Sequence, residues 1–137
     1  MRIYIATPYE AMLKKGFSLD EVIKETKKGI KKAKNRFNSD DNIFSPVIEF
    51  SKEHKDMPRD EVMSLCFKEL SMCDVIYIPN LTQSKNSDGI KAEMEYAKNN
   101  SIKIISEIWL SAYGQGDWQC YLCIRVPIKQ NKRVKIL

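Results

Sequence analysis

The sequence contains no long apolar run, which excludes the commonest form of membrane attachment. A transmembrane helix needs about 20 consecutive apolar residues, and no stretch of the 137-residue chain approaches that length. The opening segment, MRIYIATPYE, is short and ends in polar residues, so it lacks the apolar region of a signal peptide. We therefore expect no membrane partner and a cytoplasmic location.

Metal ligands are also scarce. His54 is the only histidine, and the four cysteines are Cys66, Cys73, Cys120 and Cys123. The last two form a C-x-x-C pair, which can indicate zinc or redox chemistry. No second pair exists, and the surrounding residues have the pattern of a strand, where positions three apart face opposite sides. We expect reduced thiols, no metal site and no cofactor.

Positive charge exceeds negative charge, with 23 lysines and arginines against 18 acidic residues. Basic side chains crowd a predicted helix over 19–37 and the segment 125–135. Such clusters can bind nucleic acid. However, the helical cluster interleaves with an apolar stripe and lacks aromatic residues on which bases could stack. We favour a solvated helix face over a nucleic-acid partner.

Residues 73–105 have the pattern of a β-α-β unit. The short, β-branched run 75–78 predicts a buried strand. A polar segment follows, then a helical pattern over 89–100, and the run 102–105 predicts the returning parallel strand.

The helix over 89–100 carries the most informative carboxylate. Its apolar residues share one face; Glu93 lies at the border of that face, whereas Glu95 points to solvent. Ser87 and Asp88 precede the helix, where N-cap oxygens are favoured and free N–H groups attract an anion. Glu93 is therefore either a surface carboxylate stabilised by the helix N-terminus or an acid facing a ligand cleft.

The first strand, over 2–6, is followed by Thr7-Pro8-Tyr9, where proline ends the ladder. Ligands of open α/β sheets bind at the carboxyl ends of strands. Tyr9 therefore either offers its hydroxyl and ring to a ligand or packs over the core.

Three further elements are predicted before the β-α-β unit. Ser18 and Glu21 form a capping box at the start of the helix over 19–37, whose apolar stripe includes Ile30. Residues 43–46 predict a strand that ends in proline, and 47–58 predict an irregular segment.

A helix over 59–72 places Glu69 near the middle of its apolar face. A carboxylate there needs a partner, a shifted pKa or an opening onto a cleft. Glu69 either pairs with a group in the core or faces the ligand site, where it could act as acid or base.

The order β-α-β-α-β-α-β predicts an α/β fold: a Rossmann-like, open and mostly parallel sheet flanked by helices. The segments 119–126 and 133–137 predict a C-terminal β-hairpin extension. We expect one domain over 1–137, with a core over 1–105 and the extension over 106–137.

Three segments, IYIATPYE, CDVIYIPN and TQSKNSDGIKAEMEYA, together resemble the nucleoside 2-deoxyribosyltransferase superfamily, which includes the 2′-deoxynucleoside 5′-phosphate N-hydrolases. The resemblance covers about residues 1–105. It implies that Glu93 attacks C1′ of a (deoxy)ribose and forms a glycosyl-enzyme intermediate. It also implies that Tyr9 orients Glu93, while Ser87 and the Gly89 amide hold a 5′-phosphate.

Thr7, Pro8 and Asp88 belong to the same motifs and join the expected substrate-binding residues. Two positions depart from the family pattern. Cys66 stands where the family has the aspartate that protonates the leaving base, and Lys91 replaces a usual glycine. Glu69, one turn beyond Cys66, is our candidate for replacing the missing acid.

These observations lead to one preferred function and one alternative. The preferred function is N-glycosidic cleavage or transfer on a nucleoside monophosphate by a homo-oligomer. The alternative is a catalytically silent protein that sequesters a nucleotide, for example a signal in phage–host conflict; the changes at Cys66 and Lys91 favour it. Residues 106–118 and the basic C-terminal hairpin are the segments that we expect to complete a neighbouring subunit's site.

Overall fold

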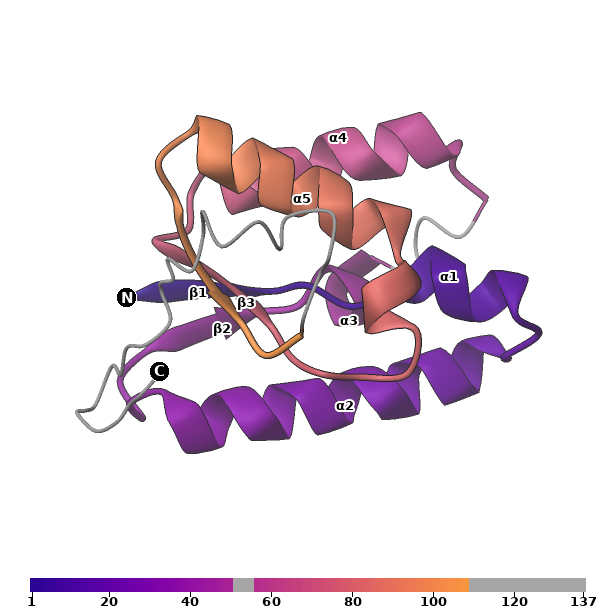
Figure 1. The fold of residues 1–137 in the computed structure, drawn as a ribbon, viewed down its shortest axis with the longest axis horizontal. Helices are drawn as coiled ribbons and strands as arrows, with labels where there is room; N and C mark the ends of the chain where they lie inside the picture. Colours follow the sequence, from indigo (N-terminus) through magenta and orange to yellow (C-terminus); the bar gives the residue numbers. More distant parts are fainter. Residues whose placement is uncertain (51–55, 109–137) are drawn as a thin grey trace.

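A four-stranded, all-parallel sheet forms the centre of the protein, as the sequence predicted (Figure 1). The computed structural model describes residues 1–50 and 56–108. The strands are β1 (Arg2–Ile5), β2 (Asn42–Phe44), β3 (Val75–Ile78) and β4 (Lys103–Ser106), in the order β2-β1-β3-β4. Every residue of β3 is buried, as expected of a central strand in a sheet covered on both faces.

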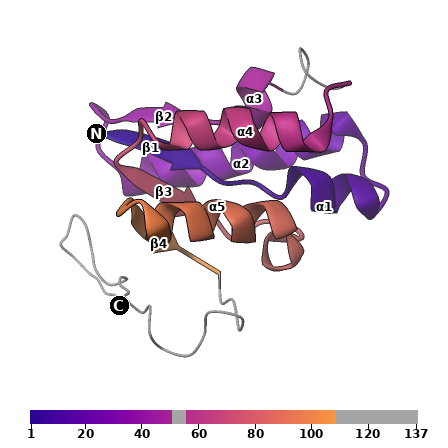
Figure 2. The same ribbon diagram turned by 90° about the horizontal axis from the view of Figure 1, so that it is seen from above.

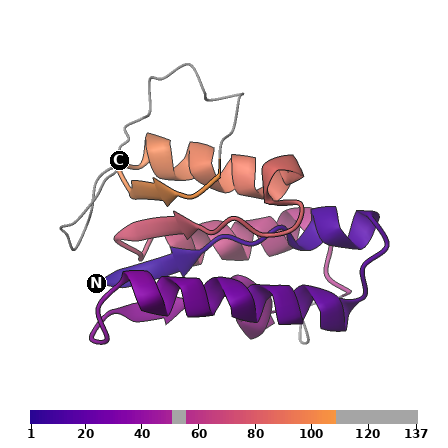
Figure 3. The same cartoon turned by 60° about the horizontal axis from the view of Figure 1, so that its bottom comes forward.

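Helices cover both faces of this sheet. On one face lie α4 (Arg59–Leu70) and α5 (Asp88–Asn99), which pack side by side (Figure 2). On the other lies the long helix α2 (Leu19–Arg36) (Figure 3). Alternate residues of each strand therefore enter different cores, which is the side-chain periodicity of a β-strand. Tyr4 and Ile76 pack toward α4 and α5, and Ile5 and Tyr77 toward α2.

The long helix begins and packs largely as predicted. The Ser18 hydroxyl accepts the Glu21 amide, and the Glu21 carboxylate accepts the Ser18 amide, so the capping box is confirmed. Gly29 is buried, whereas Ile30, on the expected apolar stripe, is only half-buried. A Cβ on Gly29 would lie 3.1 Å from Pro79. Glycine therefore allows α2 to approach the loop after β3.

Two short helices were not predicted. The residues after β1 form α1 (Tyr9–Lys14), where a loop was expected, and α3 (Pro46–Phe50) occupies the end of the predicted strand 43–46 and the start of the segment expected to be irregular. Both begin at or just after a proline, which favours the first helical position. Neither is long enough to show a helical period in the sequence.

The strand order creates a crevice at the carboxyl edge of the sheet. The chain leaves β1 toward α2 on one face and leaves β3 toward α5 on the other, although β1 and β3 are neighbours. Such a change of direction is where open α/β sheets bind ligands. The predicted C-terminal β-hairpin lies outside the described residues. Within 1–50 and 56–108, no helix is both long and apolar enough to cross a membrane.

Candidate functional site

A cavity of about 210 Å³ opens at this carboxyl edge. Its lining comes from the segment after β1, from α3, from Met57 to the middle of α4, and from the first half of α5. The polar and charged lining residues are Thr7, Tyr9, Glu10, Arg59, Cys66 and Glu93. Aliphatic, methionine and aromatic side chains form most of the remaining wall. No group of three or more metal-ligating side chains gathers in the part of the chain that the structure describes.

Glu93 provides a buried carboxylate in this cavity. The residue is only 5% exposed, so the alternative of a surface carboxylate is wrong, whereas Glu95 is exposed as predicted. Burial raises the pKa of Glu93 to about 7, although a hydrogen bond from Tyr4 and the charge of Arg59 both oppose the rise. At neutral pH this carboxyl is thus close to the midpoint of its titration.

Tyr4, not Tyr9, donates a hydrogen bond to Glu93. Tyr4 is fully buried on β1, and its hydroxyl binds Oε2 of the carboxylate. Burial, followed by the charge of Glu93, raises the Tyr4 pKa well above its ordinary value, so the phenol keeps its proton. The expectation that Tyr9 orients Glu93 therefore gives way to Tyr4. Tyr9 lines the same cavity from the first turn of α1.

Cys66 lies beside this pair. It is buried on α4, lines the cavity and lies close to the Tyr4 hydroxyl. Burial and the Glu93 charge raise the pKa of its thiol to about 11. Cys66 is consequently a neutral thiol at physiological pH and a far weaker acid than a carboxyl at this position would be.

The start of α5 lies partly in the cavity. Ser87 is the N-cap, and its hydroxyl accepts the Ile90 amide. The hydroxyl oxygen therefore already satisfies part of the helix terminus. Gly89 lines the cavity, but Ser87, Asp88 and Pro8 are not part of its lining. The Thr7 hydroxyl, which is buried, has no hydrogen-bond partner among the described residues.

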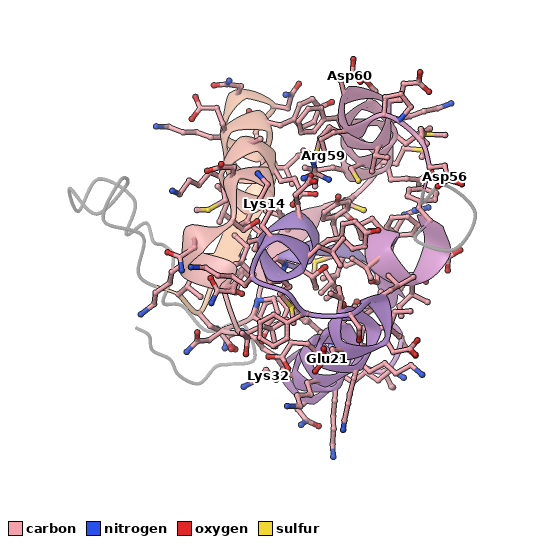
Figure 4. The ribbon with its side chains drawn as sticks, turned by 90° about the vertical axis from the view of Figure 1, so that its right-hand side faces the viewer. Lys14, Glu21, Lys32, Asp56, Arg59 and Asp60 are labelled. Atoms are coloured by element: carbon pink, nitrogen blue, oxygen red, sulfur yellow. The ribbon has the colours of Figure 1, made fainter. Side chains whose placement is uncertain are left out.

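Sequence reasoning missed Arg59. Its side chain reaches from the first residue of α4 into the space between α4 and α5, while Asp60 points outward (Figure 4). Its Nε lies 2.6 Å from Oε1 of Glu10, and its Nη2 would lie 2.6 Å from a Cβ placed on Gly89. A cation in the first turn of a helix opposes the helix dipole, and that was the one signal the sequence offered.

Glu69 is not brought to the cavity. Its carboxylate lies 3.6 Å from Arg2, at the opposite end of β1, and its side chain is 25% exposed. The helix α4 starts at the carboxyl edge of the sheet and ends near the amino edge, so the turn beyond Cys66 leads away from the cavity. The ion pair with Arg2, rather than a role in acid–base chemistry, explains why a carboxylate stands at this position. Lys91 also lies outside the lining.

A protein-family model described as "Domain of unknown function (DUF4406)" matches residues 1–106, and the chain belongs to this family. No curated protein and no solved structure matches the chain.

Proposed function

From the motif resemblance and the cavity, we propose that the protein binds a nucleoside 5′-monophosphate and cleaves or transfers its N-glycosidic bond. Glu93 is the proposed nucleophile. The observation that carries the proposal is the buried Glu93 carboxyl, which lies in a cavity together with Gly89 at the start of α5. An acid and an anion-attracting helix start in one cavity match the two ends of a ribose 5-phosphate.

The proposed chemistry follows a retaining mechanism. The Glu93 oxygen bonds to C1′ as the bond from C1′ to the base nitrogen breaks, and the electron pair of that bond leaves with the base. The base takes up a proton from solvent, and the nucleophile of the second step returns a proton to solvent. A water molecule, or a second base, then attacks C1′ and releases Glu93. Hydrolysis gives a sugar phosphate, and transfer gives a new nucleotide.

The raised pKa of Glu93 is compatible with a reaction near neutral pH. Only the ionised carboxylate can attack C1′, and a pKa of about 7 leaves a substantial fraction ionised. The hydrogen bond from Tyr4 holds one carboxylate oxygen. It leaves the other oxygen as the candidate attacking atom.

The cavity is smaller than the roughly 300–1,000 Å³ of sites that bury an entire drug-sized ligand. It suits the sugar and phosphate, and Phe50 and Tyr9 in its lining offer aromatic surfaces to the base.

Cys66 favours a second candidate, a catalytically silent nucleotide-binding protein. A thiol with a pKa of about 11 protonates a leaving base much less readily than a carboxylic acid would. Such a protein would retain the cavity and sequester its nucleotide. A homo-oligomer completed by residues 106–137 remains a prediction under both functions.

One experiment separates the two functions. The protein is incubated with a panel of ribo- and deoxyribonucleoside monophosphates, free base is measured by chromatography, and binding is measured by calorimetry. Base release that disappears in Glu93→Gln and persists in Glu95→Gln supports the enzyme. Binding without base release supports the silent protein, and the absence of both rejects the nucleotide site.

A further inference from the structure

The ion pair between Arg59 and Glu10 is placed where a ligand can exchange with it. The pair joins α4 to α1 across the cavity wall, with 2.6 Å between Arg59 Nε and Glu10 Oε1. Both side chains are partly exposed, Arg59 by 40% and Glu10 by 37%. Ion pairs with this exposure contribute little to stability. An anion that enters the cavity can therefore replace the Glu10 carboxylate at low cost.

Arg59 and the start of α5 together attract an anion at this point. The Arg59 guanidinium covers Gly89, in the first turn of the 12-residue helix α5, whose free N–H groups carry partial positive charge. The same guanidinium stands at the start of α4, a second helix N-terminus. The carboxyls of the cavity lining are Glu10 and the more distant Glu93, which burial leaves only partly ionised at neutral pH. Asp60, Glu61 and Asp88 stand in the first turns of the same two helices but outside that lining. A dianion suits this environment better than a single carboxylate.

A second observation points to a polar ligand in this cavity. Thr7 is 8% exposed and lines the cavity, and its hydroxyl has no hydrogen-bond partner within the described part of the chain. A buried hydroxyl without a hydrogen-bond partner is unfavourable, because it has lost its hydration. An oxygen-rich ligand in the cavity can supply the missing partner.

We propose that Arg59 is the residue that selects phosphorylated ligands, and that the 5′-phosphate displaces Glu10 from the guanidinium. This inference rests on the proposed nucleotide site and specifies its ligand class, a pentose 5-phosphate ester. In the ligand-free protein Glu10 holds the guanidinium over Gly89. A planar guanidinium can then bind phosphate through two parallel hydrogen bonds. An unphosphorylated nucleoside brings no group that can replace Glu10, so it binds weakly.

The test uses ribose 5-phosphate and ribose as probes, with affinities from isothermal titration calorimetry. We expect the intact protein to prefer ribose 5-phosphate. Arg59→Gln should weaken its binding by about tenfold to a hundredfold, the effect of a lost charged hydrogen bond, and should leave ribose binding unchanged. Glu10→Gln should tighten ribose 5-phosphate binding, because it removes the competing carboxylate. In the double variant, which combines Arg59→Gln with Glu10→Gln, the replacement of Glu10 should no longer tighten ribose 5-phosphate binding.

Arg36→Gln is the matched control, since Arg36 also pairs with a glutamate, Glu107, and has a similar exposure, but packs beside Tyr77 on the other face of the sheet. Ribose 5-phosphate affinity that is equal in Arg59→Gln and the control overturns the role of Arg59 and leaves the nucleotide site standing. Failure of ribose 5-phosphate and of all nucleoside monophosphates to bind the intact protein overturns both proposals.

Discussion

The Tyr4 hydroxyl, at the centre of β1, donates a hydrogen bond to the Glu93 carboxylate, which α5 carries 89 positions later in the chain. The pair joins the sheet to a helix inside the core that also contains Cys66. A phenol that keeps its proton is a permanent donor, and it favours the ionised carboxylate that it binds. The pair thereby supplies a buried carboxyl that can still ionise near neutral pH.

Replacing Tyr4 with phenylalanine tests this relationship. The hydrogen bond lowers the Glu93 pKa, so its loss should raise that pKa above its present value of about 7. We expect any pH-dependent property of Glu93, base release included, to shift toward alkaline pH. Titration of the carboxyl by carbon-13 NMR measures the shift directly.

Tyr77→Phe is the matched control, because Tyr77 donates a comparable hydrogen bond to Glu107 on the other side of the sheet. It should leave the Glu93 titration unchanged. An unchanged Glu93 titration in Tyr4→Phe would show that this hydrogen bond does not tune the carboxyl.

The stability of the fold should depend on Glu93 between pH 4.5 and 7. The ordinary pKa of 4.5 describes the unfolded chain, and burial raises the folded value to about 7. In this window the folded protein binds more protons than the unfolded chain, so this group lowers the free energy of unfolding as the pH rises. The loss is complete above pH 7 and amounts to about 3 kcal/mol.

Glu93→Gln should therefore be more stable than the natural protein at pH 8 and similar to it at pH 4. Chemical denaturation at both pH values measures the difference. Glu95→Gln, an exposed change on the same helix, should show no such pH-dependent gain. A Glu93→Gln protein that is less stable at pH 8 would mean that the ionised carboxylate is well solvated or well paired in the fold.

Parts of this arrangement follow from local patterns, and parts do not. The helical period predicted that Glu93 borders the core, and the apolar run predicted β3 as a buried strand. Tyr4 lay inside an apolar strand, so only the packing of α5 over β1 reveals the partner of its hydroxyl. The contact of Arg59 with Gly89 joins two helices 30 positions apart and has no local signature. The sequence could not exclude Glu69 from the ligand site, because the helical pattern shows which face of α4 packs on the sheet but not which end of the sheet each residue lies over.

Gly89→Ala should impair ligand binding without weakening the fold. Its Cβ would lie 2.6 Å from Arg59 Nη2, which is the end of a flexible side chain that can move. Alanine in a helix is favoured over glycine by up to about 1 kcal/mol, so stability should hold or rise. The displaced guanidinium should lower the affinity for ribose 5-phosphate, measured by calorimetry.

Gly16→Ala provides the opposite control. Gly16 has a φ of 97°, and no atom lies within 4 Å of the position that a Cβ would take there. Backbone strain should reduce its stability, while ribose 5-phosphate affinity stays unchanged. If Gly89→Ala kept full affinity, the guanidinium would not need its place over the start of α5.

Cys66→Asp tests whether the missing acid limits catalysis. Cys66 lines the cavity beside Tyr4 and Glu93, so a carboxyl there stands where it can reach the leaving base. General acid catalysis contributes about 10²–10⁴-fold, and we expect base release from a nucleoside monophosphate to rise by up to that factor. The new carboxyl should also lower stability at high pH, because it lies close to Glu93.

Cys66→Ser, which adds a polar group but no acid, should bring no increase in base release. If Cys66→Asp still binds the nucleotide and releases no base, acid supply is not the limiting step, and the silent nucleotide-binding function becomes the better account of this cavity.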